Sequence, residues 1–214
     1  MIDLYNIDCM EYLRICKNNE FDLAIVDPPC GIGESGAKNH TRGKLAKATK
    51  YKAFAGEDKE PMSEEYFQEL ERVSENQIIW GANHFRAKNS SCWLVWDKLN
   101  SGDFADAELA YTSFNTAVRV FRYMWNGMLQ HDMKNKEQRI HPTQKPVKLY
   151  EWLLMNYAKK GDRILDTHLG SGSISIACHN LGFDLVGCEL DVDYFKAAEK
   201  RLLLHQMQLR IPME

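Results

Sequence analysis

The chain has 214 residues, of which 44% are hydrophobic and 27% charged, and its formal net charge is −3. These values fit one α/β domain with a single sizeable core, and they argue against a chain dominated by disorder. No stretch approaches the roughly 20 apolar residues of a membrane-spanning helix, and no basic segment opens the sequence, so we expect a cytoplasmic protein without a membrane partner.

Cysteine and histidine are dispersed along the sequence. The six cysteines form no Cys-x-x-Cys pair, and no two of the seven histidines stand four residues apart. Structural metal sites need clustered ligands, so we expect no bound metal and reduced thiols packed in the core.

The first part of the chain predicts alternating strands and helices. Hydrophobic periodicity and turn residues indicate a strand at 2–5, a helix at 9–16, a strand at 22–26, a long polar loop at 28–60, a helix at 63–74 and a strand at 77–80. A β-α-β beginning of this kind is typical of a parallel sheet with helices on its faces.

Three β-rich runs without intervening helices follow, at 93–96, 107–113 and 117–124, and we expect them to form an antiparallel edge. After a polar loop at 126–142 the alternation resumes, with a helix at 148–157, a strand at 163–166, a helix at 173–181, a strand at 184–188 and a helix at 194–207. The sequence therefore predicts one domain, residues 1–214, of the α/β class. Its sheet should be doubly wound and mostly parallel, with an antiparallel edge.

The last predicted helix has no strand after it. A doubly wound sheet should continue from that helix into another parallel strand, and the strand at 2–5 can fill this place beside the strand at 184–188. Asp8 and Asp27, which follow the first two strands, would then lie near opposite ends of one ligand.

Residues Asp27-Pro28-Pro29-Cys30 come directly after the predicted strand at 22–26. A buried parallel strand that ends in an acid places the carboxylate at the carboxyl edge of the sheet. Proline has no N–H and a fixed φ, so this arm is stiff and offers only acceptors, the carboxylate and free carbonyls. Such an arm suits an amino group, and these four residues are the catalytic candidates.

The second candidate site is the strand, glycine turn and helix start at residues 164–173. Gly170 and Gly172 allow the backbone to approach a ligand, and the helix N-terminus offers free N–H groups. Glu189 ends the next strand, where it can accept hydrogen bonds from ribose hydroxyls. Ser175 stands where a dinucleotide fingerprint has its third glycine, so a ribose without a pyrophosphate fits better than NAD or FAD.

The segment 38–52 carries six basic residues and no acidic one, inside an acidic chain. A solvated surface loop is one reading, but the position directly after the acceptor arm favours contacts with nucleic-acid phosphates. We therefore predict that the loops at 31–60 and 126–142 contact nucleic acid. The nucleic-acid-binding candidates are Lys38, Arg42, Lys44, Lys47, Lys50, Lys52, Lys134, Lys136 and Arg139.

Three motifs in this order resemble a known family. Asp-Pro-Pro lies at 27–29, His-Pro-Thr-Gln-Lys-Pro at 141–146, and Asp-Thr-His-Leu-Gly-Ser-Gly at 166–172. The chain resembles the amino-group DNA methyltransferases of the circularly permuted β class, and its compact size resembles the phage and prophage forms. The resemblance covers nearly the whole chain and implies a Rossmann-like methyltransferase sheet.

The resemblance implies S-adenosylmethionine as the cofactor. Asp166 and the glycine turn would hold its methionine part, Glu189 its ribose, and Asp8 its adenine amino group. The motif at 141–146 would close over the methionine end through Thr143 and Lys145. The full set of cofactor-binding candidates is Asp8, Cys9, Asp27, Thr143, Lys145, Asp166, His168, Gly170, Ser171, Gly172, Glu189 and Leu190.

The resemblance also implies methyl transfer to an exocyclic amine of a base in DNA. The lone pair of the adenine N6 amine is delocalised into the ring, so two acceptors, Asp27 and the Pro28 carbonyl, would favour its pyramidal form and align it for in-line transfer. The base must leave the duplex to reach this arm, at a cost of roughly a few kcal/mol.

Two positions depart from the family pattern. Cys30 stands where the family has an aromatic residue that stacks on the flipped base, so roughly 1–3 kcal/mol of stacking is missing. His168 stands where a phenylalanine is usual. The departure at Cys30 puts binding of the target base in question.

Several substrates and roles stay open. Aspartate rather than serine at position 27 favours adenine N6 over cytosine N4. Few residues remain to read base edges, so we expect short or relaxed sequence specificity. Methylation of a protein side-chain amide is disfavoured by the basic loop, whereas a catalytically weakened subunit that binds cofactor or DNA is a rival of another class. The oligomeric state, a homodimer included, is also open.

Overall fold

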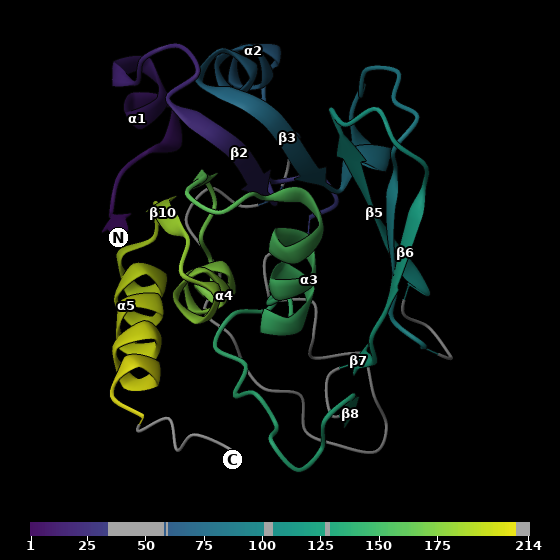
Figure 1. Cartoon of the computed structure of the whole chain (residues 1–214), viewed down its shortest axis with the longest axis vertical. Helices are drawn as coiled ribbons and strands as arrows, with labels where there is room; N and C mark the ends of the chain where they lie inside the picture. Colours follow the sequence, from purple (N-terminus) through teal and green to yellow (C-terminus); the bar gives the residue numbers. More distant parts are fainter. Residues whose placement is uncertain (34–57, 59, 101–104, 127–128, 209–214) are drawn as a thin grey trace.

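The computed structural model describes residues 1–33, 58, 60–100, 105–126 and 129–208. Its main feature is an eight-stranded sheet in the order β1, β10, β9, β2, β3, β5, β4, β6 (Figure 1). A second, two-stranded sheet pairs β7 (Trp125–Asn126) with β8 (Leu129–Gln130). The basic segment 38–52 lies outside the described residues.

Five neighbouring strands form the parallel part of the sheet: β1 (Ile2–Tyr5), β10 (Asp184–Cys188), β9 (Arg163–Asp166), β2 (Phe21–Val26) and β3 (Ser74–Trp80). β1 pairs with β10 from Ile2 opposite Leu185 to Tyr5 opposite Cys188. This pairing confirms the prediction that the N-terminal strand completes the sheet beside the last strand. The comparison with a circularly permuted family order stays an interpretation of the motif sequence.

The edge formed by β5 (Ala107–Thr112), β4 (Leu94–Asp97) and β6 (Arg119–Arg122) is antiparallel only in part. β5 runs antiparallel to β3 and to β4, as predicted, but β6 runs parallel to β4. The expectation of a wholly antiparallel edge is wrong for this last pair. Both sides of β5 are occupied by β3 and β4, so β6 adds to the free side of β4, and two chain reversals give it the direction of β4.

Helices cover both faces of the sheet, which confirms the doubly wound class. In Figure 1, α1 (Cys9–Ile15) and α2 (Glu64–Val73) lie on one side, and α3 (Val147–Tyr157), α4 (Ser173–Leu181) and α5 (Val192–Gln206) lie on the other. Side chains of a strand alternate between faces. Accordingly, Leu23 and Ile25 of β2 join the core under α3 and α4, whereas Ala24 and Val26 join the core under α1 and α2.

Two absences hold for the described part of the chain. None of its helices is long and apolar enough to cross a membrane. The same residues bring together no group of three His, Cys, Asp or Glu side chains that could hold a metal ion.

Replacement of Leu153 by alanine should test the core under α3. Leu153 is fully buried, and truncation of a buried leucine leaves a cavity, so Leu153→Ala should lower the free energy of unfolding by about 2–5 kcal/mol. Met155 on the same helix is 64% exposed, so Met155→Ala should change it by less than about 0.5 kcal/mol. Urea unfolding followed by circular dichroism measures both, and equal losses would contradict the packing described here.

Candidate active site

Acidic side chains gather where the parallel strands end. Asp27 follows β2, Asp166 ends β9, Glu189 follows β10, and Asp8 lies three residues beyond β1. Parallel neighbours present their carboxyl ends at the same edge of the sheet, and ligands of open α/β sheets bind there. The structure therefore brings together the acceptor arm and the glycine turn, which lie far apart in the sequence.

The glycine turn leads from β9 into α4. Gly170 and Gly172 have φ of 52° and 68°, a left-handed conformation that glycine adopts without a steric penalty, and Gly172 is the N-cap of α4. The Glu189 carboxylate holds this turn through the N–H of Gly170, at 2.8 Å, and also accepts from the N–H of Asp191, at 2.8 Å. Glu189 thus shapes the turn, and its predicted contact with a ribose stays a prediction.

Asp166 is almost completely buried beneath this turn. Its exposed fraction is 2%, and Oδ1 accepts a hydrogen bond from the backbone N–H of His168, at 3.0 Å. Burial raises the pKa of Asp166 to about 8; the His168 N–H opposes the shift, and the Asp27 and Glu189 carboxylates add to it. A positively charged ligand group placed beside this carboxyl would favour its ionised form.

Asp8 is the N-cap of α1. Its Oδ1 accepts from the N–H groups of Met10, at 2.7 Å, and Glu11, at 3.3 Å. Capping of this kind stabilises a helix by typically about 1 kcal/mol. The predicted contact of Asp8 with an adenine amino group therefore has to share this carboxylate with the cap.

His168 belongs to a partly buried chain of polar side chains. Its Nδ1 lies 2.9 Å from Thr167 Oγ1, which lies 2.7 Å from the Tyr66 hydroxyl, and its Nε2 lies 3.9 Å from Cys9 Sγ. Burial lowers the pKa of His168 to about 4, so the ring is neutral at pH 7. Neither Tyr66 nor Thr167 was predicted as a site residue. An aromatic residue on an amphipathic helix, such as Tyr66, usually signals only core packing.

Asp27 is held by a lysine of the distant motif at 141–146. Lys145 Nζ lies 2.5 Å from Asp27 Oδ2 and 3.0 Å from Glu108 Oε2, and Glu108 also pairs with Lys98. Lys145 is 5% exposed, and its ammonium lies 5.5 Å from the centre of the Trp80 ring. Lys145 was predicted as a cofactor contact; that prediction stays open, but the direct partners of its ammonium are acids.

The rest of the acceptor arm, from Pro28 to Gly31, is held by hydrogen bonds of its own. The Cys30 thiol donates to the Pro28 carbonyl, at 3.3 Å, and its sulfur packs closely against Gly81. The N–H of Gly31 donates to the Asp58 carboxylate, at 2.6 Å. Burial raises the pKa of Cys30 to about 12, so the side chain remains a thiol.

The motif at 141–146 packs against the glycine turn. The ring of His141 lies beside Gly170 and forms an edge contact with Tyr194, with ring centroids 4.4 Å apart. The Lys145 carbonyl accepts a hydrogen bond from Ser173 Oγ, at 2.7 Å. Thr143, the other predicted contact, is exposed, and Ser171 is buried in the turn. The motif therefore links the glycine turn to the acceptor arm.

The predicted DNA-binding residues fall into two groups. Lys134 and Lys136 are exposed in the segment after β8, and Arg139 is partly buried, where it donates to the Pro142 carbonyl, at 2.7 Å, and lies 5.9 Å from the Trp125 ring. This placement favours a structural role for Arg139. The other six, Lys38, Arg42, Lys44, Lys47, Lys50 and Lys52, lie outside the described residues.

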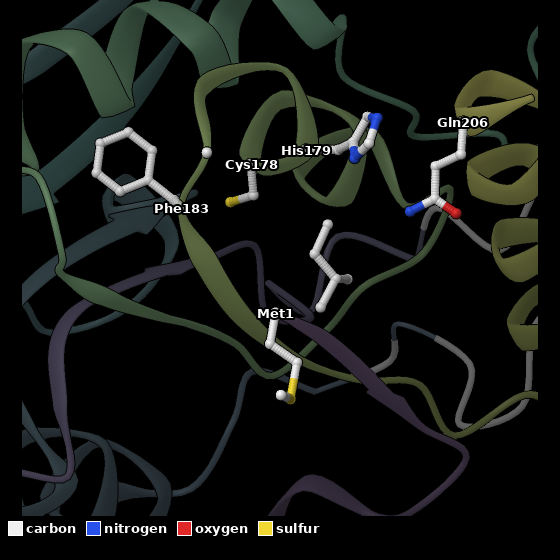
Figure 2. Close-up of a pocket in the computed structure, with 7 residues that line it drawn as sticks. Met1, Cys178, His179, Phe183 and Gln206 are labelled. Atoms are coloured by element: carbon white, nitrogen blue, oxygen red, sulfur yellow. The ribbon is translucent and has the colours of Figure 1, made fainter. Parts of the chain in front are cut away.

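A hollow elsewhere in the molecule does not belong to this site. It has a volume of about 280 Å³, and Met1, Cys178, His179, Phe183 and Gln206 are among the residues that line it (Figure 2). Met1 and Phe183 precede β1 and β10, so the hollow lies at the amino end of the sheet. The acidic cluster lies at the opposite edge.

The sequence is similar to a DNA methylase family model and to Type II methyltransferases. Residues 105–200 match the family model described as DNA methylase. Over these residues the chain is similar to the DNA methylases. It is 24% identical to Type II methyltransferase M2.DpnII of Streptococcus pneumoniae across 93% of this chain and 88% of that protein. Identity to Type II methyltransferase M.HpaI of Haemophilus parainfluenzae is 37%, but over 32% of this chain and only 22% of that relative.

Solved structures of DNA methyltransferases share the fold. The M1.HpyAVI–SAM complex superposes with a TM-score of 0.57 at 22% identity, covering 94% of this chain and 100% of that one. The cytosine-N4-specific PvuII DNA methyltransferase superposes with a TM-score of 0.59 at 12% identity, covering 94% and 86% of the two chains. These likenesses confirm the Rossmann-like methyltransferase fold predicted for the chain.

The close packing of the glycine turn can be tested by comparing Gly172, the N-cap of α4, with Gly182, its C-cap. An added Cβ at Gly172 would lie 3.0 Å from Ala198 Cβ and 3.2 Å from Ser175 Oγ, whereas at Gly182 (φ 76°) it would meet open space. Gly172→Ala should therefore lower the free energy of unfolding by about 2–4 kcal/mol, and Gly182→Ala by only about 1–2 kcal/mol. Denaturant unfolding of both variants measures the difference; equal losses would show that the turn relaxes around the methyl group.

Proposed function

We propose that the protein transfers a methyl group from S-adenosylmethionine to the exocyclic N6 amine of adenine in DNA. The observation that carries the proposal is the placement of the Asp27-Pro28 acceptor arm beside the glycine turn, at one edge of a DNA methylase-type sheet. Neither motif alone would give a reaction. Together they bring an acceptor pair for an amine next to a turn suited to a nucleoside.

The residues at the sheet edge fit the proposed cofactor. S-adenosylmethionine supplies a methyl group on a positively charged sulfur, and it also carries an amino group and a ribose. The buried Asp166 carboxyl suits the amino group, because a nearby cation offsets the cost of its burial. The left-handed Gly170 and Gly172 let the backbone approach the methionine part, and Glu189 lies where a ribose can be bound.

The acceptor arm would act on the target amine. Lys145 occupies Oδ2 of Asp27, so Oδ1 is the oxygen that would accept from the amine, and the Pro28 carbonyl would accept its second hydrogen. Two acceptors draw electron density onto the nitrogen and orient its lone pair. Orientation of the nucleophile is a large part of what such a site contributes, because a displacement at carbon requires collinear alignment.

Cytosine N4 is the second candidate. Both amines require the same acceptor arm, and the PvuII enzyme, which shares the fold, is described as cytosine-N4-specific. Aspartate at position 27, rather than serine, favours adenine. A catalytically weakened subunit remains the candidate of another class, since Cys30 offers no aromatic surface to the base. Short or relaxed sequence specificity, and a phosphate-binding role for the basic loops, are parts of the same proposal.

Transfer of tritium from labelled S-adenosylmethionine to unmethylated DNA, followed by nucleoside analysis, tests the function. Label should appear in N6-methyladenine. Asp27→Ala should lower the transfer rate by a factor of at least about 100 while cofactor affinity changes little, because an acceptor aimed at the reacting group is lost. Asp162→Ala, at the opposite edge of the sheet, is the matched control and should retain the rate.

Each alternative outcome has a definite meaning. Label in N4-methylcytosine would show that the methyl acceptor is cytosine and not adenine. Cofactor binding without transfer to any DNA would favour the subunit. Equal loss of transfer and of cofactor affinity in Asp27→Ala would contradict the role of Asp27.

Binding of the cofactor should release protons at pH 7. The pKa of Asp166 is about 8 in the free protein, so its carboxyl is largely protonated at pH 7, and a bound ammonium group would favour the ionised form. We expect release of up to about one proton per site and an affinity that rises with pH until about 8. Calorimetric titration in buffers of different ionisation enthalpy measures the release, and Asp166→Asn should abolish it. Tight binding without release would show that Asp166 does not face the amino group.

A further inference from the structure

A chain of four alternating charges runs from the acceptor arm into the antiparallel part of the sheet. Asp27 follows β2, Lys145 precedes α3, Glu108 lies in β5, and Lys98 follows β4. Lys145 Nζ bridges Asp27 Oδ2, at 2.5 Å, and Glu108 Oε2, at 3.0 Å, and Lys98 pairs with the other oxygen of Glu108. The charges of the two carboxylates, Asp27 and Glu108, and the two ammonium groups sum to zero.

Lys145 is fixed at both ends. Its carbonyl accepts from Ser173 Oγ, at 2.7 Å, and the next residue, Pro146, has a restricted φ and is the N-cap of α3. Its ammonium lies over the Trp80 ring and is 5% exposed. A long side chain normally loses much conformational entropy when it is held in one geometry. Here the backbone anchor and the Glu108–Lys98 pair restrain it in advance.

We propose that Lys145 is a positioning residue for the reaction, which acts through Asp27: held by Glu108 and Lys98, its ammonium keeps the Asp27 carboxylate ionised and leaves Oδ1 directed at the target amine. This inference rests on the proposed function. It assigns to the lysine of the 141–146 motif a role toward the acceptor arm.

The surroundings of Asp27 explain why it needs this cation. Burial raises the pKa of Asp27; the Lys145 ammonium opposes the shift, and the Glu108 carboxylate adds to it. The two ammonium groups in turn lower the pKa of Glu108 to about 2, against the effect of burial. Without Lys145, burial and the neighbouring carboxyl groups would raise the pKa of Asp27 further. Asp27 would then stay protonated up to a higher pH. The charged or titratable groups that act on Asp27 or lie around it are Lys145, Glu108, Lys98, Asp166, Cys30, Tyr66 and Tyr150.

The sign of the expected pH effect follows from the role of Asp27. An aspartate that must accept a hydrogen bond loses function as the pH falls through its pKa, which sets the acid limb of the rate profile. A nearby opposite charge lowers the pKa of a carboxyl by about 1–3 units, so removal of Lys145 should move the acid limb upward by about 1–3 pH units. Lys145→Arg keeps the charge and should leave the limb in place, even where the rate falls.

The test combines two measurements on the full chain. The first is the pH profile of tritium transfer for the wild type, Lys145→Met, Lys145→Arg and the control Lys148→Met. Lys148 lies on α3, is 62% exposed and pairs with Glu151, so its loss should not move the limb. The second is the titration of the Asp27 carboxyl carbon by NMR in protein labelled at aspartate, assigned by the loss of its signal in Asp27→Asn.

Lys145→Met leaves Asp27 and Glu108 with Lys98 as the remaining cation of the chain. Because an uncompensated buried charge is strongly destabilising, this variant can fail to fold. The double variant Lys145→Met with Glu108→Gln then serves in its place, because it removes one charge of each sign. The Asp27 titration should still move upward, since Lys145 is the stronger of the two influences.

The outcomes separate this inference from the proposed function. The inference is supported if the Asp27 titration and the acid limb of the rate profile both move to higher pH in Lys145→Met and both stay at their wild-type pH in Lys145→Arg. An unshifted Asp27 titration in a folded Lys145→Met or double variant overturns it and leaves Lys145 with a structural role. Absence of transfer in the wild type would refute the proposed function and with it the catalytic part of the inference, while the titration would still show whether Lys145 holds Asp27 ionised.

Discussion

Carboxyl groups crowd together at the carboxyl edge of the parallel strands, and each must find a donor there. A buried carboxylate without a partner is unstable, and neighbouring carboxylates raise each other's pKa. Backbone N–H groups serve three of them: those of α1 for Asp8, that of His168 for Asp166, and that of Gly170 for Glu189. The helix start and the turns after the strands are arranged so that their free N–H groups face these acids.

Asp27 is the exception, because two prolines follow it. Pro28 and Pro29 have no N–H, so the residues after β2 cannot donate to the carboxylate as those after β9 donate to Asp166. The donor comes instead from Lys145, which lies far away in the sequence. The same prolines that leave the arm with acceptors alone therefore require a cation from elsewhere in the fold. The packing of the 141–146 motif against the glycine turn delivers it.

Local signals predicted much of this arrangement. Asp27 before two prolines, and Gly170 and Gly172 between a strand and a helix, are recognisable because their chemistry depends on neighbours in the sequence. The place of β1 followed from the handedness and continuity of doubly wound sheets. The partners of Lys145 and the direction of β6 could not be predicted in this way, because both depend on which strands occupy the two sides of β5. Glu108, which joins Lys145 to Lys98, stands in a β-rich run that carries no sign of a charged partner.

Cys30 shows how a departure from a family pattern can keep the local geometry. The thiol donates to the Pro28 carbonyl, at 3.3 Å, and fills the space against Gly81, so the arm keeps its shape without an aromatic ring. A carbonyl oxygen has two lone pairs, and a thiol is a weak donor, so Pro28 retains the capacity to accept from an amine. A ring introduced at position 30 could not follow the direction of the thiol, because Gly81 lies there, and would have to turn away from it. A cysteine at position 30 therefore leaves both acceptors of the arm in place.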